Sequence, residues 1–324
     1  MTIPKTKNEV AALRVVNRYR RQVDQMEDMT ARMLAARYAI LSRNIRKDLK
    51  SLKYRDPRNR PMIVRYKTDI QPVIEKRART YAQEADEAMV SLAKRTARMG
   101  AEAADKSARK VVEKEARKWE KVSTAGLFSG PLFAASREAL KKLPGAVSDR
   151  ISELVQQAVG MAEQGFDWLM SRVGEALGGL WSGIQRTVRT LAEQMFRRAQ
   201  QEQAQKTPVT KWLRLANHET ACLACLILEG TIYDNREDFA DHPNGRCTIM
   251  PIESGTHHDE HPGRDWLEQQ DEETQRRILG KTRYEAWRNG EISLDDMVEV
   301  VNDPVYGPLP HVIQLNRLGL TPLK

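Results

Sequence analysis

The chain has 324 residues, of which 40% are hydrophobic and 30% are charged, and its formal net charge is +9. This length accommodates two or three domains with a real hydrophobic core, and the composition excludes a disordered polyelectrolyte. Three cysteines are too few for a disulfide-built secreted domain, so we expect a reducing compartment in which thiols are free to bind metal.

Nothing in the sequence predicts a membrane partner. No apolar run follows the lysines of the N-terminal MTIPKTKNEV, so no signal peptide is expected. The least polar segment, 146–184, is interrupted by acidic and basic side chains, and no stretch of about 18 apolar residues exists to span a bilayer. We therefore expect a soluble protein.

Positive charge is concentrated in the N-terminal third. Residues 1–121 hold 31 Lys and Arg against 16 Asp and Glu, whereas 122–324 hold 22 against 28. A basic segment of this kind is typical of contact with a polyanion, although solvated helix faces have the same composition. The side chains that we predict to contact nucleic acid are Arg14, Arg18, Arg21, Arg43, Arg46, Lys47, Lys50, Arg55, Arg58 and Arg60.

The basic third is predicted to form long helices. Residues 8–51 carry apolar side chains at near-helical spacing, and the turn-rich segment 55–61 marks the end of this helix. A second helical region is predicted over 68–121. Its apolar stripe is thin, so it needs a partner helix, an oligomer or a larger surface to be stable.

The central region is predicted to be a loop followed by amphipathic helix. Apolar side chains in 122–135 fit either a loop tucked onto the core or a docking segment for a partner. After Pro144-Gly145 the apolar residues follow steps of three and four, with Ser148 as a plausible N-cap. Glycines interrupt this pattern, so we expect the helix to kink or split near Gly178-Gly179.

After Pro208 the pattern becomes that of a compact α+β module. Short strands are predicted at 209–216, 230–234 and 246–252. All three cysteines of the chain lie within this module.

The C-terminal part is predicted to be helical and then extended. A helix over 265–279 is expected to end at Gly280. Ser293 with Asp296 resembles a capping box that opens a further helix. The Pro- and Gly-punctuated tail, 303–324, is expected to lie extended on another surface.

The sequence thus predicts a mainly α fold with a small α+β zinc-knuckle module. Its predicted segments are a basic helical arm (1–121), a helical region (122–205), the zinc-knuckle module (206–255) and a helical and extended tail (256–324).

A candidate metal site lies in the α+β module. Cys222, Cys225, His242 and Cys247 follow the spacing C-x2-C-x16-H-x4-C. Two thiolates from one tight turn grip an ion together, and His242 with Cys247 flank a second turn. The four side chains would complete a closed tetrahedron, which is typical of structural Zn²⁺ and leaves no position for a catalytic water.

Other readings of these residues stay open. One alternative is that the cysteines and histidine are buried bystanders, and another is that the CxxC pair is a redox dithiol. His218 lies four residues before Cys222 and is an alternative ligand or a turn cap. His257, His258 and His261 form a second polar cluster, for which we expect a solvated loop rather than a metal site.

The sequence offers no set of catalytic residues. Metal-dependent hydrolysis needs an open coordination position and a nearby general base, and nothing identifies one of Glu219, Glu229 or Asp241 as that base. A zinc deaminase carries an H-x-E motif before a P-C-x-x-C motif. In this chain the CxxC pair comes before the histidine, and the glutamate of H-x-E is missing. A nuclease of the HNH type remains an alternative because Asp241-His242 superficially fits its Asp-His step.

The cysteine-rich segment resembles the Mu F-like head-morphogenesis proteins of tailed bacteriophages. Their pattern, C-x-x-C-x-x-L-x-G followed by H-P-x-C-R-C, is matched by Cys222, Cys225, Leu228, Gly230, His242, Pro243, Arg246 and Cys247. The helix 184–194 and the segment 266–298 are similar to flanking parts of that family, so the resemblance covers about 184–303. Gly245 stands where many relatives carry a further cysteine, and His218 where an aspartate is common.

The resemblance implies a non-enzymatic minor capsid protein. Such proteins enter the procapsid in a few copies, associate with the portal protein and help to build heads that package or eject DNA. The implied partners are portal protein, capsid or scaffold proteins and double-stranded DNA, and the implied place is the capsid interior near the portal vertex after assembly in the host cytoplasm. The alternatives are a zinc-containing nuclease and an export module of a phage-derived toxin system.

Overall fold

The fold of the chain is mainly helical, as predicted. The computed structural model describes residues 4–54, 58–114, 117–161, 165–218, 220–243, 245–258 and 260–323. Within these ranges no helix has the length and apolar character needed to cross a bilayer. Contacts divide the chain into two compact units: unit 1 (Met1–Val23, Lys94–Phe128 and Ala192–Lys324) and unit 2 (Asp24–Ala93 and Ser129–Leu191).

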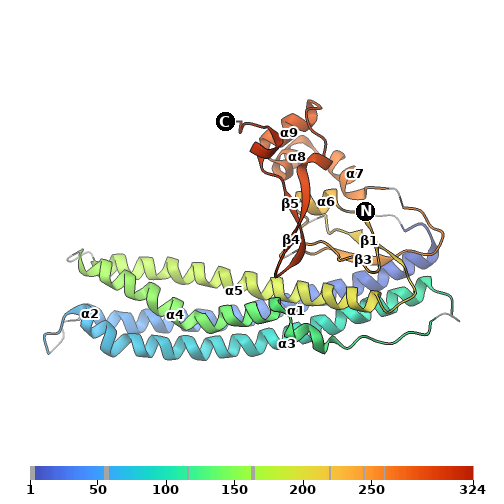
Figure 1. Cartoon of the computed structure of the whole chain (residues 1–324). Helices are drawn as coiled ribbons and strands as arrows, with labels where there is room; N and C mark the ends of the chain where they lie inside the picture. Colours follow the sequence, from blue (N-terminus) through green and yellow to red (C-terminus); the bar gives the residue numbers. More distant parts are fainter. Residues whose placement is uncertain are drawn as a thin grey trace. The chain divides into compact units, whose positions relative to one another are not determined.

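Long helices make up most of the chain up to residue 204 (Figure 1). The long helices are α1 (Lys7–Lys50), α3 (Gln71–Val111), α4 (Pro131–Val159) and α5 (Gly165–Ala204), and the short α2 (Met62–Arg65) lies between α1 and α3. A 3-10 turn (Ser51–Lys53) follows α1, and a π-helical turn (Tyr66–Ile70) precedes α3. The predicted helix 8–51 is confirmed, whereas the second helix ends ten residues before the predicted position 121.

In unit 2, parts of α1, α3, α4 and α5 pack side by side (Figure 1). The ring of Tyr38 lies 5.3 Å from that of Tyr81 and 5.4 Å from that of Trp181, measured between centroids. The Tyr38 hydroxyl donates to the carbonyl of Leu177 over 2.7 Å. This aromatic contact supplies the partner surface that the thin apolar stripe of α3 requires.

Helix α4 corrects two predictions. It begins at Pro131 and continues through Pro144, so Ser148 lies in the helix interior and is not an N-cap. Ser148 is buried, accepts from Gln71 over 3.0 Å and donates to Glu75 over 3.0 Å. Tertiary packing of the buried Pro144 therefore outweighs the hydrogen bond that proline removes from the helix.

The break in the amphipathic region also differs from the prediction. Helix α5 runs through Gly178-Gly179 without interruption, and the chain leaves the helix at Gly160 instead. Leu127, in a 3-10 turn (Thr124–Ser129), and Leu132, at the start of α4, are both buried. These burials support the reading in which 122–135 packs onto the core, but residues 131–135 form the first part of α4 and not a loop.

Unit 1 contains a three-stranded antiparallel sheet in the order β2-β1-β3. All three predicted strands are confirmed: β1 (Lys211–Leu215), β2 (Ile232–Asp234) and β3 (Thr248–Pro251). Alternate residues of β1 pack on opposite faces, with Trp212 against alanines of α3 and α5 and Leu213 against Ala12 of α1. The central strand is thus buried on both faces.

The rest of unit 1 consists of short helices and a hairpin. The helices are α6 (Leu223–Ile227), α7 (Pro262–Glu268), α8 (Glu272–Leu279) and α9 (Lys281–Arg288), and the hairpin strands are β4 (Val298–Asp303) and β5 (Gly307–Val312). Short 3-10 turns lie at Asp295–Met297 and Leu315–Leu318. Apolar residues of α6 to α9, including Leu223, Leu267 and Leu279, share one core cluster.

Two C-terminal predictions need correction. The predicted helix 265–279 is divided in two, because Asp271 caps α8 by accepting from the backbone amide of Thr274 over 2.7 Å. The capping box of Ser293 and Asp296 is present, but it opens only a 3-10 turn before β4. The valines that follow are β-branched, and they pair with β5 as a strand.

The first turn of α1 is tied to the loop after β3. Glu9 and His258 are both buried, and the ring Nε2 of His258 lies 3.2 Å from each carboxylate oxygen of Glu9. The same carboxylate accepts from the backbone amide of Glu253 over 3.1 Å. The expectation of a solvated histidine loop is therefore wrong for His258, while His257 is exposed.

Candidate metal centre

Two of the predicted ligands come from one turn of backbone. Cys222 directly precedes α6, and Cys225 lies within it. Since residues three apart lie on the same side of a helical turn, their sulfur atoms point in one direction. Cys222 is exposed and Cys225 is buried, so the pair extends from the surface of unit 1 into its interior.

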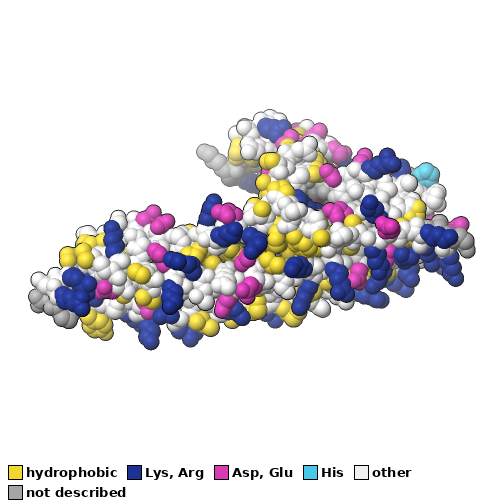
Figure 2. All heavy atoms as spheres, turned by 60° about the horizontal axis from the view of Figure 1, so that its bottom comes forward, with side chains coloured by type: hydrophobic (Ala, Val, Ile, Leu, Met, Phe, Trp, Pro, Cys, Tyr) yellow, Lys and Arg dark blue, Asp and Glu magenta, His cyan; other side chains and the backbone are white. Residues whose placement is uncertain are grey.

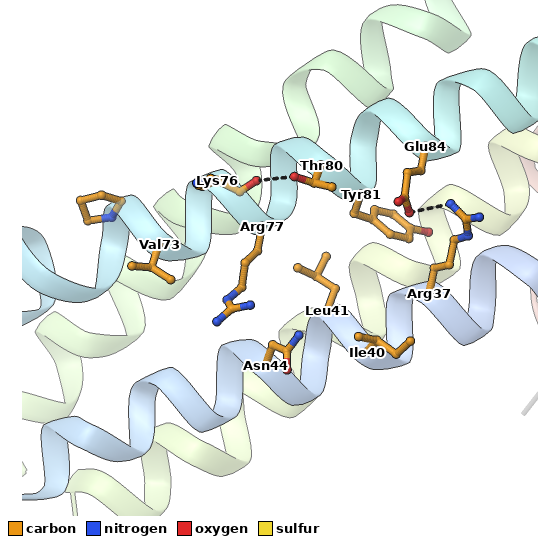
Figure 3. Close-up of a pocket in the computed structure, with 11 residues that line it drawn as sticks. Arg37, Ile40, Leu41, Asn44, Val73, Lys76, Arg77, Thr80, Tyr81 and Glu84 are labelled. Atoms are coloured by element: carbon orange, nitrogen blue, oxygen red, sulfur yellow. Dashed lines mark hydrogen bonds and ion pairs between the residues drawn. The ribbon is translucent and has the colours of Figure 1, made fainter.

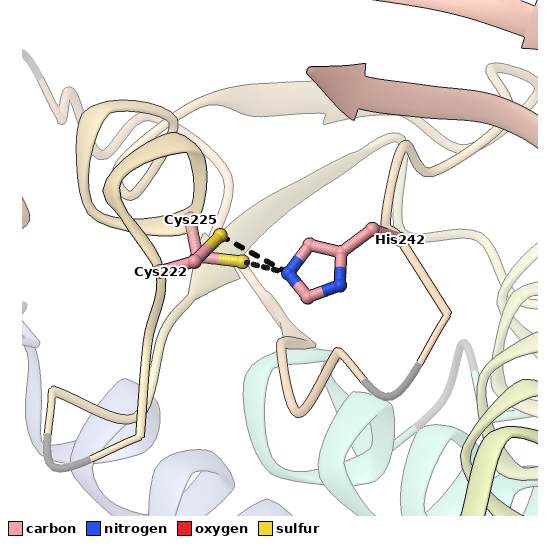
Figure 4. A group of neighbouring side chains, drawn as sticks. All are labelled: Cys222, Cys225 and His242. Carbon is pink, nitrogen blue, oxygen red and sulfur yellow. Dashed lines mark hydrogen bonds between the residues drawn. The ribbon is translucent and has the colours of Figure 1, made fainter. Parts of the chain in front are cut away.

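The imidazole of His242 faces both of these sulfur atoms (Figure 4). Its Nε2 lies 3.1 Å from Sγ of Cys222 and 3.3 Å from Sγ of Cys225. The other ring nitrogen, Nδ1, lies 2.8 Å from the carbonyl oxygen of Pro243, which holds the ring in this orientation. The three side chains form a group that could hold a metal ion.

Cys247 lies just before β3 and belongs to a second, overlapping group. It is buried, and its sulfur clusters with Cys225 and with the carboxylate of Asp241 within 4.8 Å. The two groups share Cys225, so all four predicted ligands meet around one sulfur atom. The sequence reasoning thus identified residues that the fold brings together.

The sequence reasoning missed a buried arginine beside the thiols. Arg214 of β1 is fully buried, and its Nη2 donates to Sγ of Cys247 over 3.3 Å and to Sγ of Cys225 over 3.6 Å. Its Nη1 donates to the carbonyl of Ala240. The only local signal was a charged residue inside the apolar strand pattern WLRL, which is unusual for a strand buried on both faces.

Asp241 completes a buried charge network. Its carboxylate is ion-paired with Arg197 of α5, lies 3.7 Å from Arg214, and accepts from the backbone amide of His242 over 2.9 Å. Gly245 borders this carboxylate so closely that a Cβ atom there would collide with it. The space that a side chain at position 245 would need is taken by Asp241.

The contacts among these groups shift their acidities. Hydrogen bonding with Cys225 lowers the pKa of Cys222 to about 7 and raises the pKa of His242 to about 9. Hydrogen bonding with Cys225 and burial raise the pKa of Cys247 well above its usual range. Burial alone would lower the pKa of Arg214, but the negative charges of Cys247, Asp241 and Cys225 raise it well above its usual value.

His218 is engaged elsewhere. Its Nε2 is hydrogen-bonded to the carboxylate of Glu229, which also accepts from the backbone amide of Ala216 over 3.1 Å. Its ring lies 5.0 Å from that of Trp266. Among the described residues, His218 belongs to neither group of clustered ligand atoms.

Most of the arginines and lysines predicted to contact nucleic acid lie on exposed faces of α1. Arg14, Arg18, Arg21, Arg43, Arg46, Lys47 and Lys50 are exposed, and none has an ion pair with a described residue. Arg58 is exposed, Arg60 is ion-paired with Asp69 over 2.7 Å, and Arg55 lies outside the described residues. Figure 2 shows Lys and Arg side chains spread over the visible surface, with Asp and Glu between them.

Models of known protein families, curated proteins and solved structures contain no match to this chain. The residue pattern around the cysteines and the geometry of the site are therefore the grounds for a functional proposal.

Proposed function

We propose that the chain is a minor capsid (head-morphogenesis) protein of a tailed bacteriophage. It acts without catalysis inside the head near the portal vertex, after assembly in the host cytoplasm. There it contacts portal protein, capsid or scaffold proteins and packaged DNA. The observation that carries this proposal is the meeting of Cys222, Cys225 and His242, because these residues define the pattern that resembles the Mu F-like proteins.

The cofactor that fits this donor set best is structural Zn²⁺. Three sulfurs and one imidazole nitrogen are soft and borderline ligands that suit zinc, whereas Mg²⁺ and Ca²⁺ prefer oxygen. Ligand atoms of a tetrahedral zinc site lie about 3.5–3.8 Å apart, given Zn–S and Zn–N distances of about 2.3 and 2.0 Å. The 3.1 and 3.3 Å separations from His242 to the two sulfurs are close to these values, whereas Cys247 clusters with Cys225 and not with the whole group, so its sulfur must move closer to complete the tetrahedron. Bound zinc would cross-link the turn at α6 to the segment before β3.

Zinc content tests the metal proposal directly. We expect about one zinc per chain by elemental analysis of the purified protein, and Cys225→Ser should lose it together with much of the thermal stability of the module. His257→Ala, which changes an exposed histidine outside the cluster, is the matched control and should retain zinc. Purified wild-type protein without zinc would contradict the proposal.

The unpaired basic side chains of α1 support contact with DNA phosphates. Phosphate contacts release counterions, so the logarithm of the binding constant should fall linearly with the logarithm of salt concentration. Replacing Arg14, Arg18 and Arg21 by Gln should reduce that slope by roughly 2–3 on duplex DNA of any sequence. Arg172→Gln is the control, because Arg172 is exposed but ion-paired with Glu175 over 2.6 Å. An unchanged slope in the triple variant would assign these residues to a protein partner.

Association with portal protein separates the capsid role from the nuclease alternative. We expect the chain to co-purify with the portal protein of the same phage when the two are co-expressed. The protein should leave plasmid DNA intact in the presence of Mg²⁺ or Zn²⁺. Cleavage that is abolished by His257→Ala, with no portal association, would replace this proposal by the nuclease.

A further inference from the structure

A groove in unit 2 runs between α1 and α3, and neither the metal centre nor the DNA contacts account for it. Its volume is about 830 Å³ (Figure 3). Leu41 and Tyr81 are buried at its floor, while Ile40 and Val73 line it with 54% and 40% of their surfaces exposed. Large apolar side chains that remain this exposed along one groove are typical of an interaction surface.

The lining residues follow the spacing of two helix faces. Arg37, Ile40 and Asn44 recur on α1, and Val73, Lys76 and Thr80 on α3, at steps of three and four. Ion pairs bridge the two helices along the groove: Arg37 with Glu84 over 2.7 Å, and Arg77 with Asp48 over 2.9 Å. The lining residues of α3 extend from Pro72 to Glu84, over which the helix rises roughly 18 Å, or about three turns.

Basic side chains outnumber acidic ones among the residues that line the groove. Three of its lining residues, Arg37, Lys76 and Arg77, are basic and one, Glu84, is acidic. The cations of Arg37 and Arg77 have carboxylate partners, whereas Lys76 is exposed and has no ion pair with a described residue. An occupant with apolar side chains towards Ile40 and Val73 and a carboxylate beside Lys76 would satisfy both features.

We propose that this groove binds one amphipathic helix of a partner protein, about three turns long, with an acidic edge. Two antiparallel helices form a groove into which the side-chain ridges of a third helix pack, with anchors at steps of three, four and seven residues. Exposed Met29 and Met33 continue the apolar face of α1 beyond Ile40 and give the surface adaptable side chains. This inference does not rest on the proposed capsid function.

Binding of a designed helix tests the proposal on the full-length protein. The probe is a fluorescent, stapled helical peptide of about 14 residues, with leucines on one face and glutamates along one edge. Its control replaces the glutamates by lysines. By fluorescence anisotropy we expect the acidic peptide to bind about tenfold more tightly than the basic one, with the preference weakening at high salt.

Three variants locate the binding. Ile40→Glu should weaken binding of the acidic peptide at least tenfold, because it places a like charge on the apolar wall. Lys76→Glu should reverse the preference between the two peptides. Val159→Glu is the matched control, since Val159 of α4 is 51% exposed and lies outside the groove. The affinity of this variant for the acidic peptide should equal that of the wild type. Circular dichroism of each variant checks that the helices are intact.

Several outcomes would overturn the proposal. They are equal binding of both peptides, binding that Ile40→Glu leaves intact, and loss of peptide binding in Val159→Glu. If sedimentation shows a dimer of the wild-type chain that Ile40→Glu dissociates, the occupant is a second copy instead. If duplex DNA displaces the acidic peptide from the wild-type groove and Ile40→Glu weakens that DNA binding, the groove is a nucleic-acid surface.

Discussion

Arg214 places a permanent positive charge beside the sulfur atoms of Cys225 and Cys247, in the buried part of the site. Three thiolates and one imidazole around a divalent ion carry one net negative charge, and burying that charge is costly without a counterion. The guanidinium of Arg214, which donates to Cys225 and Cys247, supplies the counterion. Asp241 and Arg197 form a further pair of opposite charges. With a divalent ion bound and all three thiols ionised, the network as a whole is therefore neutral.

We predict that Arg214→Lys weakens zinc binding 10- to 100-fold, the range typical of residues that contact metal ligands from outside. Lysine keeps the charge but loses the planar fork that reaches both sulfurs and the carbonyl of Ala240. Competition with a chromophoric chelator measures the change. Arg236→Lys, at an exposed position in the same module, is the control. Equal zinc affinity in Arg214→Lys and wild type would show that the charge alone suffices.

Gly245 is predicted to be intolerant of any side chain. A Cβ atom at this position would meet the carboxylate of Asp241, which is fixed by Arg197 and by the amide of His242. Gly245→Ala should therefore displace Asp241 and lower the free energy of unfolding by about 1–3 kcal/mol. Denaturant unfolding measures this loss. Gly255→Ala is an unsuitable control because Gly255 has a positive φ angle, so Gly126→Ala, whose Cβ would meet open space, should be used.

At the scale of elements, a cluster of polar side chains joins α1 to α3 in unit 1. The hydroxyl of Tyr19 donates to Glu102 over 2.7 Å, and Arg98 and Lys106 donate to the same carboxylate over 2.9 and 3.1 Å. Hydrogen bonds from Arg98 and Tyr19 lower the pKa of Glu102 to about 2. The carboxylate is the centre of this contact between the two helices.

The lowered pKa of Glu102 predicts a pH-dependent contribution to stability. Because the folded pKa lies below the unfolded value of 4.5, the contribution is present above about pH 4.5 and is lost as the pH falls through 2. Glu102→Gln should cost roughly 1 kcal/mol at neutral pH, and the difference from wild type should shrink as the pH falls from 4.5 to 2. Thermal unfolding between pH 7 and 2 measures it, with Glu87→Gln on the same helix as the control. A difference that stays constant with pH would contradict the prediction.

Elements could be predicted from the sequence where local pattern and tertiary packing agree. The apolar spacing of α1 is uninterrupted up to Lys50, and the three strands of unit 1 are bounded by turns. Prediction failed where packing overrides a local signal: Pro144 suggested a break inside α4, and Ser293 suggested a helix over residues that begin β4. Proline and capping residues indicate only the local free-energy cost of continuing or starting a helix. Contacts between residues distant in sequence determine whether the fold offsets that cost.

Some residues of the candidate site could likewise be predicted from local sequence, and others could not. Cys222 and Cys225 could be predicted because a CxxC pair is local, and His242 and Cys247 because they flank one turn. Arg214 and Arg197 come from a strand and a helix whose meeting depends on the whole of unit 1. No spacing in the sequence relates these arginines to the cysteines.

At the scale of the whole molecule, metal removal should affect the two units differently. All four candidate ligands lie in unit 1. A ligand that binds only the folded state stabilises it by about 4 kcal/mol at a thousand times its Kd, and chelation removes that stabilisation. We predict that a zinc chelator increases amide hydrogen exchange in β1, β3 and α6, while amides of unit 2 within α1 and α4 keep their protection. Equal loss of protection in both units would contradict this prediction.

The pairing of Glu9 with His258 has a consequence for folding during synthesis. The two residues are 249 positions apart, and both are buried. At 5–20 residues per second the ribosome needs roughly 10–50 s to add His258 after Glu9 has been made. Every segment of unit 2 has been made once Leu191 is added, whereas unit 1 must wait for its last segment. We therefore expect the first turn of α1, although it emerges before every segment of unit 2, to be among the last to reach its native contacts.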